Sequence, residues 1–387
     1  MVSLTEEIQS RILSDKIHMV DLHSQYLKIK NEIDQAIART ISSSRFIGGT
    51  SIDTFSTHLA QFLKTDHVVT CGNGTDALQI ALMALDLKKG DEVIVPAFTY
   101  VASAEVIALL GLIPIMVDVE LDTFNLKLAG VDKLISNKTK AIIPVHLYGQ
   151  SSDMNAVMSF AKKHNLFVIE DNAQSIGASY NLSDNTYKTG TIGDIGTYSF
   201  FPSKNLGAYG DGGALSTNNK ALANRIKMIA SHGQSKKYHH EIVGVNSRLD
   251  SMQAAILDVK LKYLDNYIAQ RKKVATYYDR ELKQISEITI PTRAENCDHV
   301  FHQYTIQVSN GKRDALKQYL SEHGIPSMIY YPLPLYSQVA YQKYVASDFK
   351  LANSEQLCQS VLSLPMHTEL NQDTLSYIID KIKTFFS

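Results

Sequence analysis

Tryptophan is absent from this chain of 387 residues, and cysteine is scarce. Any aromatic ring that stacks on a flat ligand must therefore come from tyrosine, phenylalanine or histidine. The three cysteines, Cys71, Cys297 and Cys358, are odd in number and far apart, without a CxxC or Cys/His pattern. Such spacing suits neither a disulfide framework nor a metal site, so we expect no bound metal and a reducing, cytoplasmic location.

Strong net charge and long apolar runs are also missing. The 38 basic and 39 acidic residues leave a formal net charge of -1, so no overall field draws the protein to nucleic acid or to an anionic membrane. No run reaches the roughly 18 apolar residues that a membrane-spanning helix needs, and the N-terminus does not resemble a secretion signal. We expect a soluble, unexported protein that binds neither nucleic acid nor membrane.

Short β-branched runs alternate with longer helical stretches from about residue 67, and this pattern predicts parallel strands joined by helical crossovers. Beyond about residue 245, a long helical stretch at 251–282 and alternating segments predict a second, smaller α+β domain. We therefore expect a polar amphipathic extension at 1–17, a large α/β domain at 18–250 and a smaller domain at 251–387. The predicted strands of the large domain are 67–71, 92–96, 113–119, 141–146, 166–170, 196–200 and 213–216.

The segment VVTCGNGTDAL leaves the first of these strands through Gly72, Asn73 and Gly74. It enters a helix at Thr75 and Asp76. Backbone N–H groups at a helix N-terminus suit a phosphate group. An ordinary tight turn with Thr75 or Asp76 as the N-cap fits the segment equally well.

The segment LFVIEDNAQSIGA ends a buried strand in Glu170 and Asp171, and Gln174 follows. In an open α/β sheet, a carboxylate at the carboxyl end of a strand lies where ligands bind. An aspartate there can hold a pyridine nitrogen in its protonated form. A helix-capping aspartate is the other interpretation.

Lys204 lies in GTYSFFPSKNLGAYGDGGAL, between an aromatic strand end and a glycine-rich stretch. Glycine lets the backbone approach a ligand closely. A lysine becomes nucleophilic when burial or a nearby positive centre removes its proton, and it then forms a Schiff base with an aldehyde. A single lysine is most often a solvated surface charge, but the two preceding segments make Lys204 a candidate nucleophile.

Taken together, the motifs closely resemble the sugar aminotransferases of the DegT/DnrJ/EryC1/StrS family, which are fold-type I enzymes dependent on pyridoxal 5'-phosphate (PLP). The resemblance extends from about residue 17 to the C-terminus. It implies a mixed, mostly parallel seven-stranded sheet between helices, a smaller α+β domain, and transamination through PLP and its pyridoxamine form, PMP. Its markers are GNGTDAL, PAFTYVAS, VHLYGQ, EDNAQSIGA, SFFPSKNLGAYGDGGA and GVNSRLDSMQAAI.

The resemblance implies a role for individual residues. Lys204 matches the lysine that forms the Schiff base with PLP and later moves protons; related sugar dehydratases carry histidine at this position. Asp171 matches the carboxylate paired with the pyridine nitrogen, and Gln174 matches the side chain near the ring hydroxyl. Tyr100, in PAFTY, matches the aromatic residue that stacks on the ring. Phosphate contacts are expected from Gly74, Thr75, Asp76 and Ser199.

The family pattern also implies a second subunit. Asn246 matches an asparagine that reaches the phosphate from the neighbouring chain, which implies a homodimer with shared active sites. Arg248 is a candidate for binding the carboxylate of the amino donor or the anionic groups of the substrate, and an interface salt bridge is its alternative. Lys236, in SHGQSKKYHHEIVG, either attracts a pyrophosphate or belongs to a solvated loop.

Tyr330 and Tyr331, in SMIYYPLPLYSQVAY, are the remaining candidate substrate contacts. The segment departs from the HYP and PLH forms that are familiar in the family. Tyr330 and Tyr336 stand where histidines are common, so the family's histidine contacts do not carry over to these two positions.

The resemblance implies a cycle of two halves. L-glutamate passes its nitrogen to PLP and leaves as 2-oxoglutarate, and a nucleotide-linked keto sugar then accepts the nitrogen. The segments GVNSRLDSMQAAI and IYYPLPLYSQ most resemble family members that act at C-3 of a UDP-linked 3-keto N-acetylhexosamine or its uronic acid. This resemblance implies a role in amino-sugar biosynthesis for surface polysaccharide such as lipopolysaccharide O-antigen. A 4-keto-6-deoxy sugar on UDP or dTDP is the alternative.

Two other classes of function remain, namely a PLP-binding sensor without turnover and a structural protein that kept the fold but lost its chemistry. The complete set Lys204, Asp171, Gln174 and Asn246 argues against both.

Overall fold

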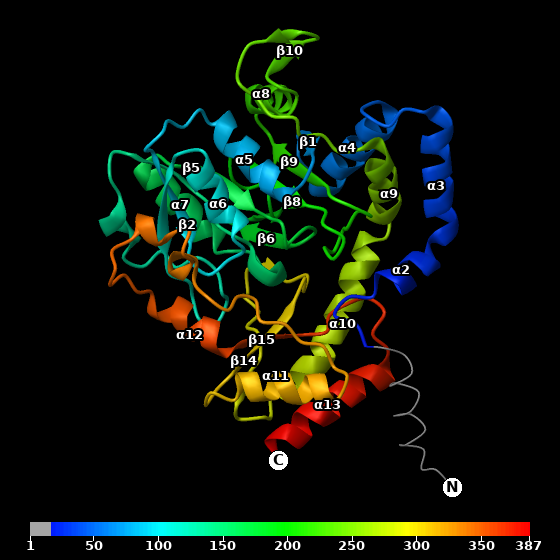
Figure 1. The fold of residues 1–387 in the computed structure, drawn as a ribbon, viewed down its shortest axis with the longest axis vertical. Coiled ribbons are helices and arrows are strands. Elements are labelled where there is room, and N and C mark those ends of the chain that lie inside the picture. The colour runs from blue at the N-terminus through cyan, green and yellow to red at the C-terminus, as the bar shows by residue number, and fades with distance from the viewer. Residues whose placement is uncertain (1–16) are drawn as a thin grey trace.

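The computed structural model describes residues 17–387, and the extension expected at 1–17 lies outside the described residues except for Ile17. The main sheet has seven strands in the order β1-β9-β8-β5-β4-β2-β3 (Figure 1). Only β9 runs against its neighbours β1 and β8, so the predicted mixed, mostly parallel sheet is confirmed. The strands are β1 His67–Cys71, β2 Glu92–Pro96, β3 Ile113–Val117, β4 Thr139–Ile142, β5 Phe167–Asp171, β8 Ile195–Ser199 and β9 Gly213–Thr217.

All seven predicted strands are present; β1 and β2 have the predicted bounds, and the other five have at least one shifted end. The largest difference is at β4, which was expected at 141–146 and ends at Ile142. Pro144 interrupts the ladder beyond that point because it has no N–H to donate. The strand expected at 113–119 ends at Val117.

Helices cover both faces of the sheet. Successive residues of a strand point to opposite faces, and both sets are apolar here, so each face needs a covering layer. Val93, Val95 and Ile169 pack in a hydrophobic cluster with the helices α5, α6 and α8. Their neighbours Ile94 and Val168 pack on the other side, in a cluster with α7. The helices in the part of the molecule that contains the main sheet are α2 Leu22–Lys28, α3 Lys30–Ser43, α4 Thr50–Leu63, α5 Gly74–Ala84, α6 Ala102–Leu109, α7 Met154–His164, α8 Lys220–Ala230 and α9 Ser251–Leu261.

A second core surrounds a small antiparallel sheet of order β12-β14-β15, at the end of the molecule that carries the C-terminus (Figure 1). The helices around it are α10 Leu264–Leu282, α11 Arg313–Glu322, α12 Ala352–Ser360 and α13 Gln372–Phe386. The small strands and 3-10 helices of the chain are β6 Ser179–Leu182, β7 Asn185–Lys188, β10 Gln234–Lys236, β11 His239–His240, β12 Ile288–Thr289, β13 Cys297–Asp298, β14 Tyr304–Val308, β15 Val361–Leu364, η1 Val131–Leu134, η2 Leu147–Gly149, η3 Leu335–Ser337 and η4 Gln342–Tyr344.

The helical stretch expected at 251–282 is two helices, α9 and α10, which are separated at residues 262–263. Ala254 and Leu257 of α9 pack with the large sheet, whereas Val274 and Tyr278 of α10 pack in the second core. The domain boundary at residue 250 stays a prediction; we propose that the chain passes from one core to the other within α10.

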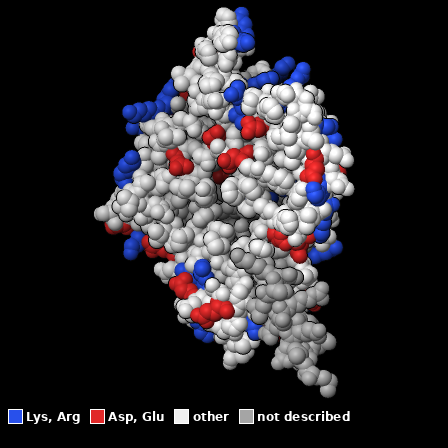
Figure 2. All heavy atoms as spheres, turned by 45° about the vertical axis from the view of Figure 1, so that its right-hand side comes forward, with Lys and Arg blue, Asp and Glu red and all other residues white. Residues whose placement is uncertain are grey.

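Charged side chains of both signs lie on the surface of the molecule. On the face shown in Figure 2, acidic and basic side chains are interspersed, and neither sign covers the face alone. None of the helices described in residues 17–387 combines the length and apolarity needed to cross a bilayer. The same residues contain no group of three His, Cys, Asp or Glu side chains placed to hold a metal ion.

Candidate active site

A cavity of about 560 Å³ opens at the carboxyl ends of β1, β2, β4, β5 and β8. Ligands bind at this edge in open α/β sheets, because the loops that follow parallel strands converge there. The segment 330–338 and two residues of the small domain, His302 and Gln303, complete the wall. The sequence-predicted site residues that line the cavity are Gly74, Thr75, Tyr100, Asp171, Gln174, Ser199, Lys204, Tyr330 and Tyr331.

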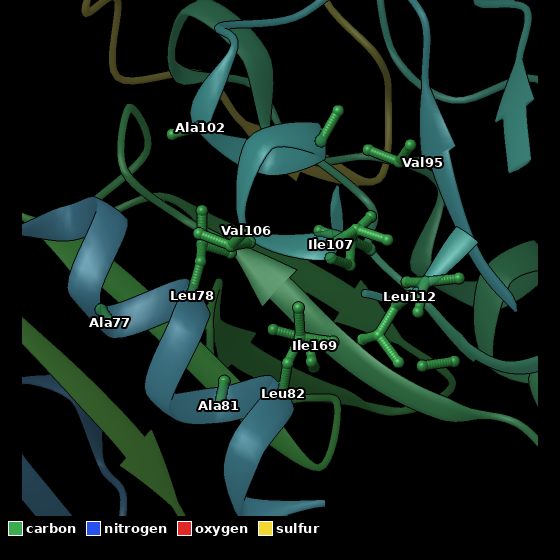
Figure 3. Packing of buried hydrophobic residues seen from close by; sticks show 14 of the residues in the cluster. Ala77, Leu78, Ala81, Leu82, Val95, Ala102, Val106, Ile107, Leu112 and Ile169 are labelled. Atoms are coloured by element: carbon green, nitrogen blue, oxygen red, sulfur yellow. The ribbon is translucent and has the colours of Figure 1, made fainter. Parts of the chain in front are cut away.

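Helix α5 presents its N-terminus to the cavity because its apolar residues hold it against the sheet. Figure 3 shows Leu78 and Leu82 of α5 close to Val106 of α6 and Ile169 of β5. The helix begins at Gly74, and its first N–H groups have no intrahelical acceptor. An N-terminus of this kind attracts an anionic group.

The N-cap of α5 is Asn73, so neither residue considered as the cap from the sequence, Thr75 or Asp76, takes that place. The side-chain oxygen of Asn73 accepts a hydrogen bond from the Asp76 N–H at 2.8 Å. Gly74 is required next to it, because a Cβ there would lie 2.6 Å from the Cβ of Ser199. The helix N-terminus and Ser199 therefore form one polar corner of the cavity.

Asp76 is engaged in other contacts. Its N–H is bonded to Asn73, and its carboxylate accepts a hydrogen bond of 2.6 Å from the Ser247 hydroxyl. Ser247 in turn accepts from the Gly72 N–H at 2.9 Å. Asp76 is not among the residues that line the cavity, so its contact with a phosphate stays a prediction.

Asp171 ends β5 and turns its carboxylate into the site. One carboxylate oxygen accepts a hydrogen bond of 2.8 Å from the Ser103 hydroxyl, and the other accepts from the Ala173 N–H at 3.2 Å. No helix follows Asp171 over residues 172–178, which excludes the interpretation as a helix cap. The carboxylate is only 5% exposed and is fixed by these two donors.

The neighbouring Glu170 points to the opposite side of β5, because side chains alternate along a strand. It is fully buried and accepts three hydrogen bonds from backbone N–H groups of the 190–193 turn. A fourth bond, of 2.9 Å, joins it to His146 Nε2. His146 Nδ1 accepts from the Ser152 N–H, which places the ring proton on Nε2. Glu170 therefore stabilises the fold behind the site, and Asp171 alone faces the cavity.

Lys204 lies on the loop between β8 and β9, and it lines the same cavity as Asp171. Burial lowers the pKa of Lys204 to about 8, and the Asp171 carboxylate partly opposes this shift. A lysine with this pKa carries a substantial fraction of free amine near neutral pH. The interpretation of Lys204 as a solvated surface charge is therefore wrong.

Aromatic rings and an amide form the remaining wall. The rings of Tyr100 and Tyr331 lie 6.3 Å apart, measured between centroids. Gln174 accepts a hydrogen bond of 2.7 Å from the Tyr148 N–H and donates one of 3.1 Å to the Tyr331 hydroxyl. Gln174 thus connects the segment that carries Tyr148 with the segment that carries Tyr331.

Sequence reasoning did not assign three of the residues at this site, Ser103, Tyr148 and His302. Ser103 and Tyr148 lie within PAFTYVAS and VHLYGQ, but their roles depend on contacts with segments far away in the chain. His302 lines the cavity, and burial with the nearby cations Lys204 and Arg271 holds its pKa well below the usual value. We find no pattern in the sequence that marks it.

Comparisons with known proteins agree with this site. The family model described as the DegT/DnrJ/EryC1/StrS aminotransferase family matches residues 27–383. The chain belongs to this family. The UDP-2-acetamido-2-deoxy-3-oxo-D-glucuronate aminotransferase of Pseudomonas aeruginosa is 44% identical over 94% of this chain and 98% of that protein. A Geobacillus stearothermophilus protein named "Pleiotropic regulatory protein" is 45% identical over 96% of this chain and 98% of its own length.

The solved structure of S. venezuelae DesV in complex with a ketimine intermediate superimposes with a TM-score of 0.92. The two sequences are 36% identical, and the match covers 96% of this chain and 99% of DesV. The predictions of a fold-type I architecture, of a PLP-dependent sugar aminotransferase and of PLP as its cofactor are confirmed.

The cavity of this aminotransferase fits PLP in the chemistry of its donors. Lys204 supplies an amine of lowered pKa, and Asp171 supplies a fixed carboxylate on the same cavity. The corner between the α5 N-terminus and Ser199 suits the phosphate, because the backbone N–H groups of the helix and the Ser199 hydroxyl lie next to each other there. This close approach requires glycine at position 74. The exposed ring of Tyr100 lies at the cavity wall.

Besides Asp76, three predicted site residues do not line the cavity of their own chain. Asn246 and Arg248 are exposed and do not line it. Lys236 is exposed on the β10–β11 hairpin, which projects from the top of the molecule in Figure 1. The roles of all three residues in binding cofactor and substrate stay predictions.

Proposed function

We propose that this protein moves the amino group of L-glutamate onto C-3 of a UDP-linked 3-keto N-acetylhexosamine or its uronic acid. The pairing of Lys204 with Asp171 in one cavity carries the proposal for the reaction. The relative from P. aeruginosa supports the choice of sugar, since its name specifies a UDP-linked 3-oxo sugar acid. The product would serve the biosynthesis of a surface polysaccharide.

Each residue of the site has a distinct task in this proposal. Bound PLP supplies an electron sink that stabilises negative charge on the reacting carbon. Asp171, held by Ser103, keeps the pyridine nitrogen protonated. Lys204 acts as base and acid, because a pKa of about 8 lets its amine take up and return a proton near neutral pH. The α5 N-terminus and Ser199 bind the phosphate and fix the position of the ring.

We further propose that the active form is a homodimer. Three apolar or aromatic side chains at the cavity, Tyr100, Phe201 and Leu333, are 57%, 54% and 48% exposed in the single chain. A second copy that covers this rim would bring Asn246 toward the phosphate and Arg248 toward the substrate. Closed twofold pairing is also the commonest form of oligomer.

The visible absorbance of the lysine-bound cofactor tests the reaction. The purified protein is loaded with PLP, then given L-glutamate, then a panel of UDP- and dTDP-linked 3-keto and 4-keto sugars. We expect glutamate to remove the absorbance band and one UDP-linked 3-keto sugar to restore it. Lys204→Ala should abolish both changes. Restoration by a 4-keto sugar alone would contradict the assignment to C-3.

A non-catalytic regulator is the second candidate, because the 45% identical relative is named a regulatory protein. The same experiment separates the two functions. A sensor would bind PLP and keep its absorbance band in the presence of excess glutamate, whereas an aminotransferase would convert the cofactor to PMP.

A further inference from the structure

The loop that carries Lys204 has no regular secondary structure and is folded back on itself. Between β8 and β9, the N–H of Phe200 bonds to the Gly212 carbonyl at 2.7 Å, and the N–H of Ala208 bonds to the Phe200 carbonyl at 2.8 Å. A Cβ at Gly207 would lie 2.2 Å from the Pro202 carbonyl oxygen. A loop this tight transmits a displacement at one residue to the others.

Helix α9 holds this loop from outside through two side chains. The amide of Gln253 accepts a hydrogen bond from the Tyr209 N–H at 2.8 Å and donates one to the Tyr209 carbonyl at 3.1 Å. The ammonium of Lys260 donates a hydrogen bond of 2.6 Å to the Gly207 carbonyl. Positions 253 and 260 are seven residues apart, close to two helical turns, so both side chains extend from the same face of α9.

Lys260 is an unusual residue for a hydrophobic core. It is 1% exposed, and none of the ion pairs found in residues 17–387 includes it. Its ammonium lies 5.0 Å from the centre of the Tyr209 ring. Burial, with a smaller contribution from the nearby cation Arg271, lowers the pKa of Lys260 to about 8.

A buried ammonium without a carboxylate partner costs stability, and an apolar side chain of similar length is often neutral or better for the fold. The hydrogen bond to the Gly207 carbonyl and the contact with the Tyr209 ring offset part of this cost, and both connect Lys260 to the 200–212 loop. Among the residues that the structure describes, the only hydrogen-bond partner of the Lys260 ammonium is the carbonyl of Gly207. Gly207 lies three residues after Lys204 in the chain.

We propose that Lys260 is a positioning residue for the catalytic lysine. Together with Gln253, it fixes the 200–212 loop on α9, so that the Lys204 side chain stays in the buried wall of the cavity. This inference rests on the proposed role of Lys204 as the cofactor lysine.

The test compares Lys260→Met with Lys262→Met, a control at the position that directly follows α9, whose lysine is exposed. The first readout needs no cofactor: apo-protein is labelled with a trace of an amine-reactive anhydride across pH, and Lys204 modification is followed by mass spectrometry. In Lys260→Met we expect the loop to loosen and Lys204 to become more solvated. The pH of half-maximal labelling should rise from about 8 toward the value of an exposed lysine, 10.5.

The second readout is kinetic. Loss of geometry at the reacting group lowers kcat, and a displacement of about 1 Å costs up to about 100-fold. We expect kcat of Lys260→Met, per mole of folded protein, to fall by about 10- to 100-fold with KM for the keto sugar unchanged. The denaturant midpoint should change little, because relief of the buried charge offsets the loss of the hydrogen bond to the Gly207 carbonyl. Lys262→Met should match the unmodified protein in all three measurements.

Gln253→Met is the second variant, since it removes the other contact of α9 with the loop and tests the proposal if Lys260→Met does not fold. An unchanged labelling midpoint of Lys204 in the folded variants would overturn the proposal. So would a loss of kcat that only follows the loss of folded protein. Failure of the proposed function can be told apart from failure of the positioning role. If the proposed function fails, the unmodified protein keeps its cofactor absorbance in glutamate, and the labelling titration of Lys204 can still be measured.

Discussion

The free amine of Lys204 at neutral pH is the quantity on which the proposed chemistry depends. With a pKa of about 8, roughly 9% of Lys204 is unprotonated at pH 7, against roughly 0.03% for a lysine at the usual 10.5. The burial of this one side chain therefore corresponds to about a 300-fold gain in reactive amine. Competitive labelling of apo-protein across pH measures the fraction directly, with exposed lysines of the same chain as internal standards.

Replacing Asp171 tests whether its carboxylate raises or lowers the pKa of Lys204. The carboxylate raises the pKa of Lys204 against the effect of burial, so Asp171→Asn should move the labelling midpoint below 8 and increase labelling at pH 7. Asp211→Asn is the matched control, because Asp211 lines the same cavity but is exposed and does not contribute to this pKa. A midpoint near 10.5 in the unmodified protein, or an upward shift in Asp171→Asn, would refute the reasoning.

Two further predictions concern the residues around the cofactor. Ser103→Ala removes a hydrogen bond to the Asp171 carboxylate worth about 1.5–3 kcal/mol, so kcat should fall by roughly 10- to 100-fold with little change in KM, as steady-state kinetics would show. An unchanged kcat in Ser103→Ala would argue against it. Gly74→Ala places a methyl group 2.6 Å from the Cβ of Ser199, so the dissociation constant for PLP, measured by fluorescence titration, should rise while the protein stays folded. Unchanged PLP affinity would show that this corner does not hold the phosphate.

The architecture could be predicted from local patterns. The β-branched runs at 67–71 and 92–96 match the observed strands β1 and β2 to the residue. Alternating residues of the strands pack on the two helical layers. The sequence did not reveal the division of α9 from α10, because a helical pattern continues through residues 262–263. The packing partner changes only further along, between Ile268 and Val274 of α10.

At the site, the sequence was sufficient for residues that lie within a recognisable motif. Asp171 and Lys204 were assigned in this way, and the structure brings them to one cavity. It was insufficient for residues whose role depends on a distant partner, such as Ser103, which reaches Asp171 across 68 positions of the chain, and Lys260, which reaches Gly207 across 53.

The sequence by itself determined the α/β class, the order of the strands along the chain and the identity of the candidate lysine, because these depend on local periodicity and on residue type. Only the tertiary structure decided that Ser103 and the Ala173 N–H fix the Asp171 carboxylate, and that burial lowers the pKa of Lys204 to about 8. Orientation and burial are set by all the elements that surround a side chain. No stretch of neighbouring residues contains that information.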